Sequence, residues 1–214
     1  DEALDKEPEV VSGVIKYSIN YPKIFNDSDD NLMRMFLPKY MEMSFKGDLF
    51  KTEIKNGKIF GTSFIGNSAD KSMMAGTNYF TAKNKCMFSE IEKNTYLNSQ
   101  PKYRIVKTEK TKKILDFNAK HAIAINEGNN DSIHLYYTDN IKIKSVNWFT
   151  AYNEIGGVLL EYEIERYEMK MTFKAIEFLE IDSTYTFEYP DDFKELEYQA
   201  YDDKIRGYFE DLKK

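Results

Sequence analysis

A repeated alternation of apolar and polar residues is the feature that most restricts the fold of this chain. In the segment 15–21, Ile and Tyr occupy the odd positions, while Lys, Ser and Asn occupy the even positions. Successive side chains of a strand point to opposite faces of a sheet, so this pattern is typical of a strand with one buried and one solvated face. Parallel strands are buried on both faces, and the alternation therefore favours a large antiparallel sheet over a doubly wound fold. It recurs at residues 41–45, 50–54, 133–137, 160–164, 169–175 and 185–189.

The segment 161–174 predicts a hairpin together with its register. If the turn is centred on Tyr167 and Glu168, acidic side chains face basic ones on the outer side of the two strands. Apolar side chains then face each other on the inner side, and a slip by one residue would reverse both faces. The predicted pairs are Glu165 with Lys170, Glu161 with Lys174, Ile164 with Met171 and Tyr162 with Phe173.

Glycine-containing turns predict further hairpins earlier in the chain. Residues 46–48 separate the strands 41–45 and 50–54, and Asn56-Gly57 ends the second of them. We expect a three-residue loop here, with Gly57 in the left-handed conformation. This loop would pair Thr52 with Phe60 and keep Phe60 and Phe64 on the inner face.

Two segments have the sequence pattern of helices. Residues 27–37 begin with acidic and Ser residues suited to a helix N-terminus, and Pro38 stops them. Residues 192–213 carry an apolar stripe at helical spacing, and Asp192 with Glu195 suggests a capping box at their start.

The charge balance and the few Cys and His residues exclude several classes of protein. The net charge is −6, and the longest basic cluster, Lys107–Lys113, is interrupted by Glu109. A solvated hairpin explains this cluster better than a nucleic-acid site, so we expect no nucleic-acid partner. Two His and one Cys exclude a disulfide framework and a Cys/His metal site. No apolar stretch approaches the ~18 residues of a membrane-spanning helix.

No motif for catalysis is convincing. Residues 61–68 nearly match a phosphate-binding loop, but Asn67 stands where the Lys is required. Residues 27–38 fail as a calcium loop at both the Gly and the Glu position. Glu161, Glu163 and Glu165 are near a glycosidase-like spacing, but they lie on the solvated face opposite Lys residues. We therefore predict no enzyme, no catalytic residue, no metal and no cofactor.

Methionine and aromatic side chains gather on the inner face of the predicted sheet and on the first helix. Methionine suits surfaces that accept varied apolar ligands, although such residues can equally fill a core. One hypothesis is a sheet curved into a half-barrel whose concave face holds an apolar ligand. The other is a filled core. The candidate ligand-binding residues are Met33, Phe36, Met43, Phe45, Trp148, Phe149, Tyr162, Met171 and Phe173.

Four short stretches, taken in order, resemble those of a known protein family. They are Phe45–Glu53, Ile114–Ala122, Tyr136–Asp139 and Ile155–Glu161. With these stretches the chain resembles an uncharacterised family of Bacteroidetes envelope proteins related in outline to the LolA/LolB lipoprotein carriers, over roughly residues 13–188. The resemblance implies a curved antiparallel sheet with a helix across its concave face. It also implies a secreted lipoprotein whose acylated Cys preceded Asp1.

These observations predict a mainly β (α+β) protein in three parts. Residues 1–9 form a flexible tether, 10–190 one LolA/LolB-like antiparallel domain, and 191–214 an amphipathic helix packed on or beside it. The predicted function is a non-enzymatic protein of the periplasm or outer membrane that binds a lipid or other apolar ligand. The alternative is a protein-interaction or scaffold lipoprotein with a filled core and an envelope protein as its partner. Membrane contact would occur only through the removed N-terminal lipid anchor.

Overall fold

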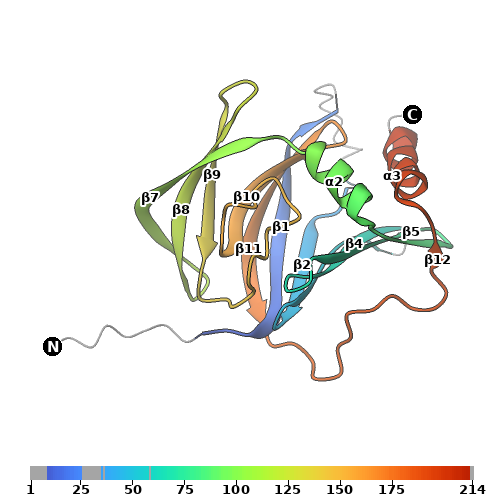
Figure 1. The fold of residues 1–214 in the computed structure, drawn as a ribbon, viewed down its shortest axis with the longest axis horizontal. Coiled ribbons are helices and arrows are strands. Elements are labelled where there is room, and N and C mark those ends of the chain that lie inside the picture. The colour runs from blue at the N-terminus through green and yellow to red at the C-terminus, as the bar shows by residue number, and fades with distance from the viewer. Residues whose placement is uncertain (1–8, 26–34, 36, 58, 213–214) are drawn as a thin grey trace.

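The strands of this protein join into one open, strongly curved, 12-stranded sheet (Figure 1). The computed structural model describes residues 9–25, 35, 37–57 and 59–212. The order across the sheet is β12-β6-β5-β4-β3-β2-β1-β11-β10-β9-β8-β7, so it does not close into a barrel. The strands are β1 (Ser12–Ile24), β2 (Tyr40–Lys46), β3 (Leu49–Asn56), β4 (Phe60–Asn67), β5 (Ser72–Tyr79), β6 (Ala82–Met87), β7 (Tyr103–Ile114), β8 (Phe117–Asn126), β9 (Ser132–Thr138), β10 (Val158–Arg166), β11 (Met169–Leu179) and β12 (Lys194–Glu195).

Strand β1 lies in the middle of the sheet and joins its two halves. On one side it pairs with β2, which continues into the meander β2 to β6. On the other side it pairs with β11, the last of the strands β7 to β11. These neighbours are antiparallel, as the alternation predicts, and only the two-residue β12 runs parallel to its neighbour, β6. The predicted fold class, a large curved antiparallel sheet with a C-terminal helix, is therefore confirmed.

The hairpin β10–β11 has the predicted register, whereas β3–β4 does not. All four predicted pairs of the C-terminal hairpin are present. In the earlier hairpin Gly57 has the predicted positive φ, +56°, but Thr52 pairs with Phe64 and Asn56 with Phe60. The strands extend further toward the turn than predicted, which adds paired residues. The shift is by an even number of residues, so the aromatic side chains keep the inner face.

Helix α2 (Glu90–Asn98) was not predicted, although its start has a recognisable pattern. Ser89 is the N-cap residue: its Oγ accepts from the Glu92 backbone N–H at 3.3 Å, and the Glu92 carboxylate accepts from the Ser89 N–H at 2.8 Å. This is a capping box of the S-x-x-E type. Among the described residues, no helix is long and apolar enough to cross a membrane.

Helix α3 (Tyr198–Leu212) lies over the inner face of the sheet and begins six residues later than predicted (Figure 1). The predicted start at Asp192 was wrong because that carboxylate pairs with Lys83 and the next residues form β12 beside β6. The ring of Tyr208 stacks on Phe60 of β4, with centroids 4.0 Å apart. The other predicted helix, 27–37, lies almost entirely outside the described residues.

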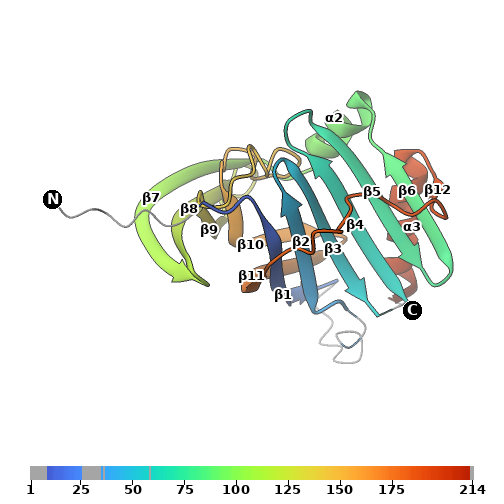
Figure 2. The same cartoon turned by 90° about the horizontal axis from the view of Figure 1, so that it is seen from below.

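The segment 180–193 crosses the outer face of the sheet (Figure 2). It forms no strand, so the strand predicted at 185–189 was wrong. The Tyr189 hydroxyl donates to the Ser63 carbonyl at 3.0 Å, and a Cβ on Gly76 would lie 2.3 Å from the Tyr189 ring. The Tyr189 ring therefore fits against the strand because Gly76 has no side chain. Of the alternating rings at 185–189, Tyr189 packs on the sheet, while Tyr185 and Phe187 contact each other with centroids 5.2 Å apart.

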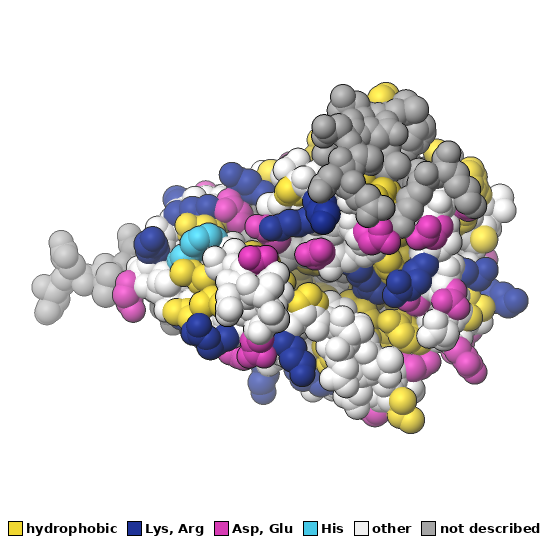
Figure 3. Space-filling view, turned by 90° about the horizontal axis from the view of Figure 1, so that it is seen from above, with side chains coloured by type: hydrophobic (Ala, Val, Ile, Leu, Met, Phe, Trp, Pro, Cys, Tyr) yellow, Lys and Arg dark blue, Asp and Glu magenta, His cyan; other side chains and the backbone are white. Residues whose placement is uncertain are grey.

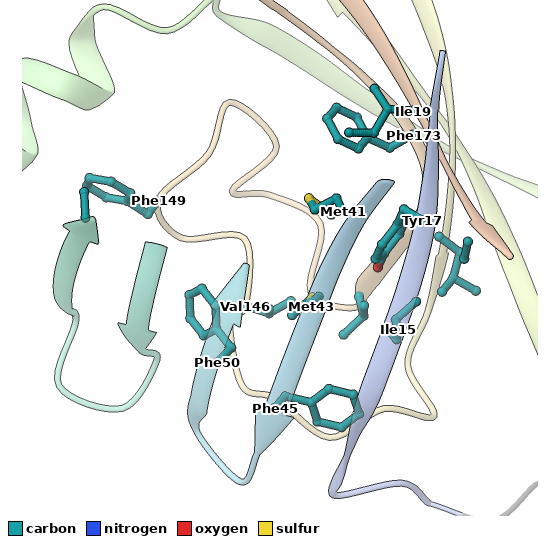
Figure 4. Close-up of a cluster of buried hydrophobic side chains, with 14 of the residues drawn as sticks. Ile15, Tyr17, Ile19, Met41, Met43, Phe45, Phe50, Val146, Phe149 and Phe173 are labelled. Carbon is teal, nitrogen blue, oxygen red and sulfur yellow. The ribbon is translucent and has the colours of Figure 1, made fainter. Parts of the chain in front are cut away.

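The apolar core lies on the inner face, where β1 contributes its odd-numbered residues. Ile15, Tyr17 and Ile19 are buried there beside Met41 and Met43 of β2 (Figure 4). The Tyr17 hydroxyl donates to the Leu159 carbonyl at 2.8 Å, so the buried polar group is satisfied. The sheet therefore encloses a continuous apolar interior.

Candidate functional site

A cavity of about 240 Å³ lies between the inner face of the sheet, the connection 139–157 and the two helices. Its volume is slightly below the ~300–1,000 Å³ that is usual for small-molecule sites. Its wall is dominated by thioether and aromatic side chains, and it has room for a slender molecule. The methionines that line it are Met41, Met43, Met73, Met169 and Met171.

Five of the nine predicted ligand-binding residues line this cavity. The inner-face positions of the sheet account for four of them, since residues at alternate positions share a face. Phe149 comes from the connection 139–157 and stacks on Tyr96 of α2, with ring centroids 4.3 Å apart. The five residues are Met43, Phe149, Tyr162, Met171 and Phe173.

Two predicted residues lie away from the cavity. Phe45 is fully buried, and its ring contacts Phe178, with centroids 6.4 Å apart, so it serves the core. Trp148 is half-buried, with the Nζ atoms of Lys71 and Lys93 at 5.3 and 5.8 Å from its ring. The rings of Trp148 and Phe149 contact each other with centroids 5.1 Å apart, but only Phe149 lines the cavity.

The other two predicted residues, Met33 and Phe36, lie outside the described residues. Beyond the prediction, the cavity is also lined by aromatic residues from β1, β3, β4, β7, α2 and α3. The alternation of β1 could have identified Tyr17 and Tyr21, whereas Tyr96 could not be found because its helix was missed. Ile205 and Phe209 reach the cavity from α3.

The tyrosine hydroxyls around the cavity are tied to the protein itself. Tyr21 donates to the Pro38 carbonyl at 2.7 Å, and Tyr152 donates to the Glu163 carbonyl. Tyr162 has a weaker partner, the Met41 sulfur at 3.8 Å. Burial raises the pKa of Tyr17, Tyr152 and Tyr162 well above the usual value. These groups are neutral at physiological pH, and they leave the wall predominantly apolar.

One charged cluster interrupts the apolar wall where β10 meets α3. Arg166 donates from Nη2 to Asp202 at 3.2 Å and from Nη1 to the Tyr96 hydroxyl at 3.1 Å. Asp202 is only 4% exposed. It also accepts from Arg206 Nε at 2.7 Å and from the Tyr167 hydroxyl at 3.1 Å. This cluster connects α3 to the end of the β10–β11 hairpin.

On the molecular face seen from above, patches of hydrophobic side chains are visible among Lys, Arg, Asp and Glu side chains (Figure 3).

Two acidic residues, Glu163 and Glu165, border the cavity. Glu163 pairs with Lys170 at 2.7 Å. Its hydrogen bond and the nearby Glu165 both contribute to raising the pKa of that Lys. Lys170 thus pairs with Glu163 and offsets only part of the combined charge of the two carboxylates.

Comparison with known proteins identifies the fold but no family. No protein-family model and no curated protein matches this chain. Two structures of PNGF-II are similar to it. The first, in space group P21, has a TM-score of 0.55 and 18% identity over 92% of this chain. The second, in space group C2, has a TM-score of 0.53 and 16% identity over 91% of this chain.

The chain spans about a third of PNGF-II, 33% and 32% in the two structures. Identity this low shows a shared fold alone. A Vibrio parahaemolyticus domain, described as an outer membrane lipoprotein-sorting protein domain, aligns over 91% of both chains with a TM-score of 0.22 and 7% identity. This TM-score is too low to support an inference about the present chain. The resemblance to a Bacteroidetes family stays a prediction.

Proposed function

We propose that this protein binds a slender apolar molecule, such as an acyl chain of medium length, in the cavity and does not transform it. The observation that carries the proposal is the cavity itself, because a fully packed core would leave no space there. Its five methionines can adjust their flexible side chains to ligands of different shape. Removal of apolar surface from water, worth about 25 cal/mol per Å², would drive binding without specific polar contacts.

The chemistry of the buried groups supports a binding role over a catalytic one. The tyrosine hydroxyls described above are neutral and hydrogen-bonded, so they are poor bases. Burial raises the pKa of the Cys86 thiol to about 12, which keeps it protonated and unreactive. Among the residues that the structure describes, no three His, Cys, Asp or Glu side chains are grouped to hold a metal ion.

The proposed location is the cell envelope, in the periplasm or at the outer membrane. The support is the sequence resemblance to envelope proteins, which implies a lipoprotein. A protein that carries or senses apolar molecules would suit that compartment, because lipids must be shielded from water when they cross the periplasm. The proposed partner is accordingly a lipid or another small apolar molecule.

The binding proposal is tested with the fluorescent apolar probe N-phenyl-1-naphthylamine, followed by its displacement with 1-decanol. Thr52 lines the cavity, so Thr52→Phe should fill it and weaken binding of the probe by about tenfold or more. Thr111→Phe places the same ring at an exposed position of β7 and should bind the probe like the natural protein. Absence of saturable binding, or equal binding by both variants, would favour the scaffold alternative.

A further inference from the structure

The cluster at the end of β10 carries one more positive than negative charge. Two guanidinium groups, Arg166 and Arg206, share the single carboxylate of Asp202. Arg166 lines the cavity, and its charged group lies 5.0 Å from the Tyr96 ring centroid and 4.8 Å from that of Tyr167. The wall of the cavity is therefore mainly apolar, with one cation, Arg166, and two carboxylates, Glu163 and Glu165, of which Glu163 pairs with Lys170.

Unused hydrogen-bond donors accompany this charge. A guanidinium has five N–H donors, and the described partners of Arg166 are the Tyr96 hydroxyl and Asp202. The Tyr96 hydroxyl accepts from Arg166, and among the described residues its own hydrogen has no acceptor. Arg166 and Tyr96 thus present adjacent donors that an additional anion could use.

The stacked rings connect this point to the methionine-lined part of the cavity. Tyr96 stacks on Phe149 and lies 6.3 Å from the Phe64 ring, and both of these rings line the same cavity. Met43 and Tyr162 line it as well. A ligand with an anionic group at Arg166 would place its apolar part against these side chains.

We infer that the ligand of the proposed site is a single-chain amphiphile with a carboxylate head, that is, a fatty acid. Its carboxylate accepts hydrogen bonds from Arg166 and Tyr96, and its chain lies along the methionines and rings. A carboxylate fits because the guanidinium fork matches its planar geometry and forms charge-assisted hydrogen bonds. This inference rests on the proposed function, since it specifies the ligand of the same cavity.

The test compares decanoate with 1-decanol, which has the same chain and a neutral head, by isothermal titration at pH 7.5. The natural protein should bind decanoate about tenfold more tightly, as expected for a hydrogen bond to a charged group. Tyr96→Phe keeps the stacked ring and removes one donor, so it should reduce this preference several-fold. Arg166→Gln should abolish the preference.

Arg166→Gln leaves Asp202 with one cation fewer, which could destabilise the fold. A second variant therefore controls for a loss of folding. The double variant Arg166→Gln/Asp202→Asn removes both charges and should also bind the two probes equally. Circular dichroism checks that it is folded. If neither probe binds the natural protein, the proposed function itself is wrong. If both bind it equally, or if the preference survives in Tyr96→Phe and in the double variant, the cavity stands and the fatty-acid inference is overturned.

Discussion

The concave face carries two apolar clusters that are built from different kinds of side chain. One, called here the aliphatic cluster although it includes two tyrosines, lies under β8, β9 and the connection 139–157, and of its members Tyr152 and Leu159 line the cavity. The other surrounds the cavity and is built from methionines and rings. The aliphatic cluster consists of Ala122, Ala124, Ile133, Leu135, Tyr137, Tyr152, Ile155 and Leu159.

The difference between the clusters shows how one curved sheet can be filled at one end and hollow at the other. Small and branched side chains interdigitate and leave little space. Around the cavity the rings contact one another instead: Tyr162 stacks on Phe173 with centroids 4.9 Å apart and meets Tyr17 edge-on at 6.0 Å. Such contacts keep the rings along the wall, and α3 then covers the space between them.

The largest expected effect comes from removing the charge that fixes α3 over the cavity. Asp202→Ala would leave Arg166 largely buried without its carboxylate partner, and we expect a loss of ~3 kcal/mol in the free energy of unfolding. The aliphatic cluster does not touch this helix, so its packing should persist. Urea unfolding measures the loss.

The neighbouring residue provides a control for this prediction. Asp203 is exposed, and its carboxylate accepts from Gln199 at 3.0 Å. Asp203→Ala should change stability by less than ~0.5 kcal/mol. Equal costs for the two Asp variants would mean that the buried cluster does not hold α3.

The next effect compares the two clusters directly through truncation of one side chain in each. Leu135 is 0% exposed in the filled cluster, and Met43 is 6% exposed at the cavity. We expect Leu135→Ala to cost ~3 kcal/mol and Met43→Ala ~1–2 kcal/mol, because a side chain beside an existing cavity has fewer contacts to lose. Similar costs in chemical denaturation would indicate that the second cluster is as well packed as the first.

A smaller effect concerns the pH dependence of stability. We expect the end of the sheet that contains His121 to contribute to this dependence and the cavity end not to contribute. His121 Nε2 lies 2.8 Å from His134 Nδ1, and burial, followed by the charge of His134, lowers the pKa of His121. The unfolded chain, with a His pKa of about 6.5, therefore binds the proton more readily. Stability is then fully present above that pH and is lost as the pH falls toward the folded pKa.

His121→Gln should flatten this dependence between about pH 7 and pH 5.5, measured as the change in Tm with pH. The cavity end has no buried His, so the Asp202→Ala variant should keep the slope of the natural protein. A slope that is the same with and without His121 would contradict the assignment.

The smallest effect concerns the turn that joins β10 and β11. Tyr167 and Glu168 both have positive φ, 52° and 60°, which L-residues seldom adopt. Glu168→Gly should relieve strain and raise stability by ~0.5 kcal/mol. Tyr167→Asn should lower it, because the ring stacks on Phe209 and its hydroxyl donates to Asp202. A loss of stability in Glu168→Gly, measured by thermal unfolding, would show that this turn is not strained.

The sequence predicted what depends on local periodicity. Alternation identified β1, β2, β3, β9, β10 and β11, but it did not identify β5, β6, β7 and β8. Opposed charges at Glu165 and Lys170 fixed the register of one hairpin. Periodicity did not reveal α2, because a nine-residue helix has too short an apolar stripe, although Ser89 and Glu92 gave its start. The predicted strand at 185–189 failed because the burial of Tyr189 comes from its packing on Gly76 of the distant strand β5, a contact that only the tertiary structure creates.

The candidate site was predictable to the extent that it lies on strands. Met43, Tyr162, Met171 and Phe173 follow from which face is buried. The cation Arg166 could not be recognised, since its role depends on Asp202, which is 36 residues away in the sequence. A cavity is a property of packing between elements, and no pattern in one element reveals it.

The central claim is that the methionine-lined cavity takes up an apolar molecule, and methyl NMR of the protein with ¹³C-labelled methionine tests it most directly. Met41, Met43, Met73, Met169 and Met171 line the cavity, while Met87, which is 62% exposed, lies outside it. On titration with 1-decanol, the account predicts saturable shifts of the five cavity methyl signals and an unchanged Met87 signal. Unchanged cavity signals, or shifts confined to exposed methionines, would contradict it.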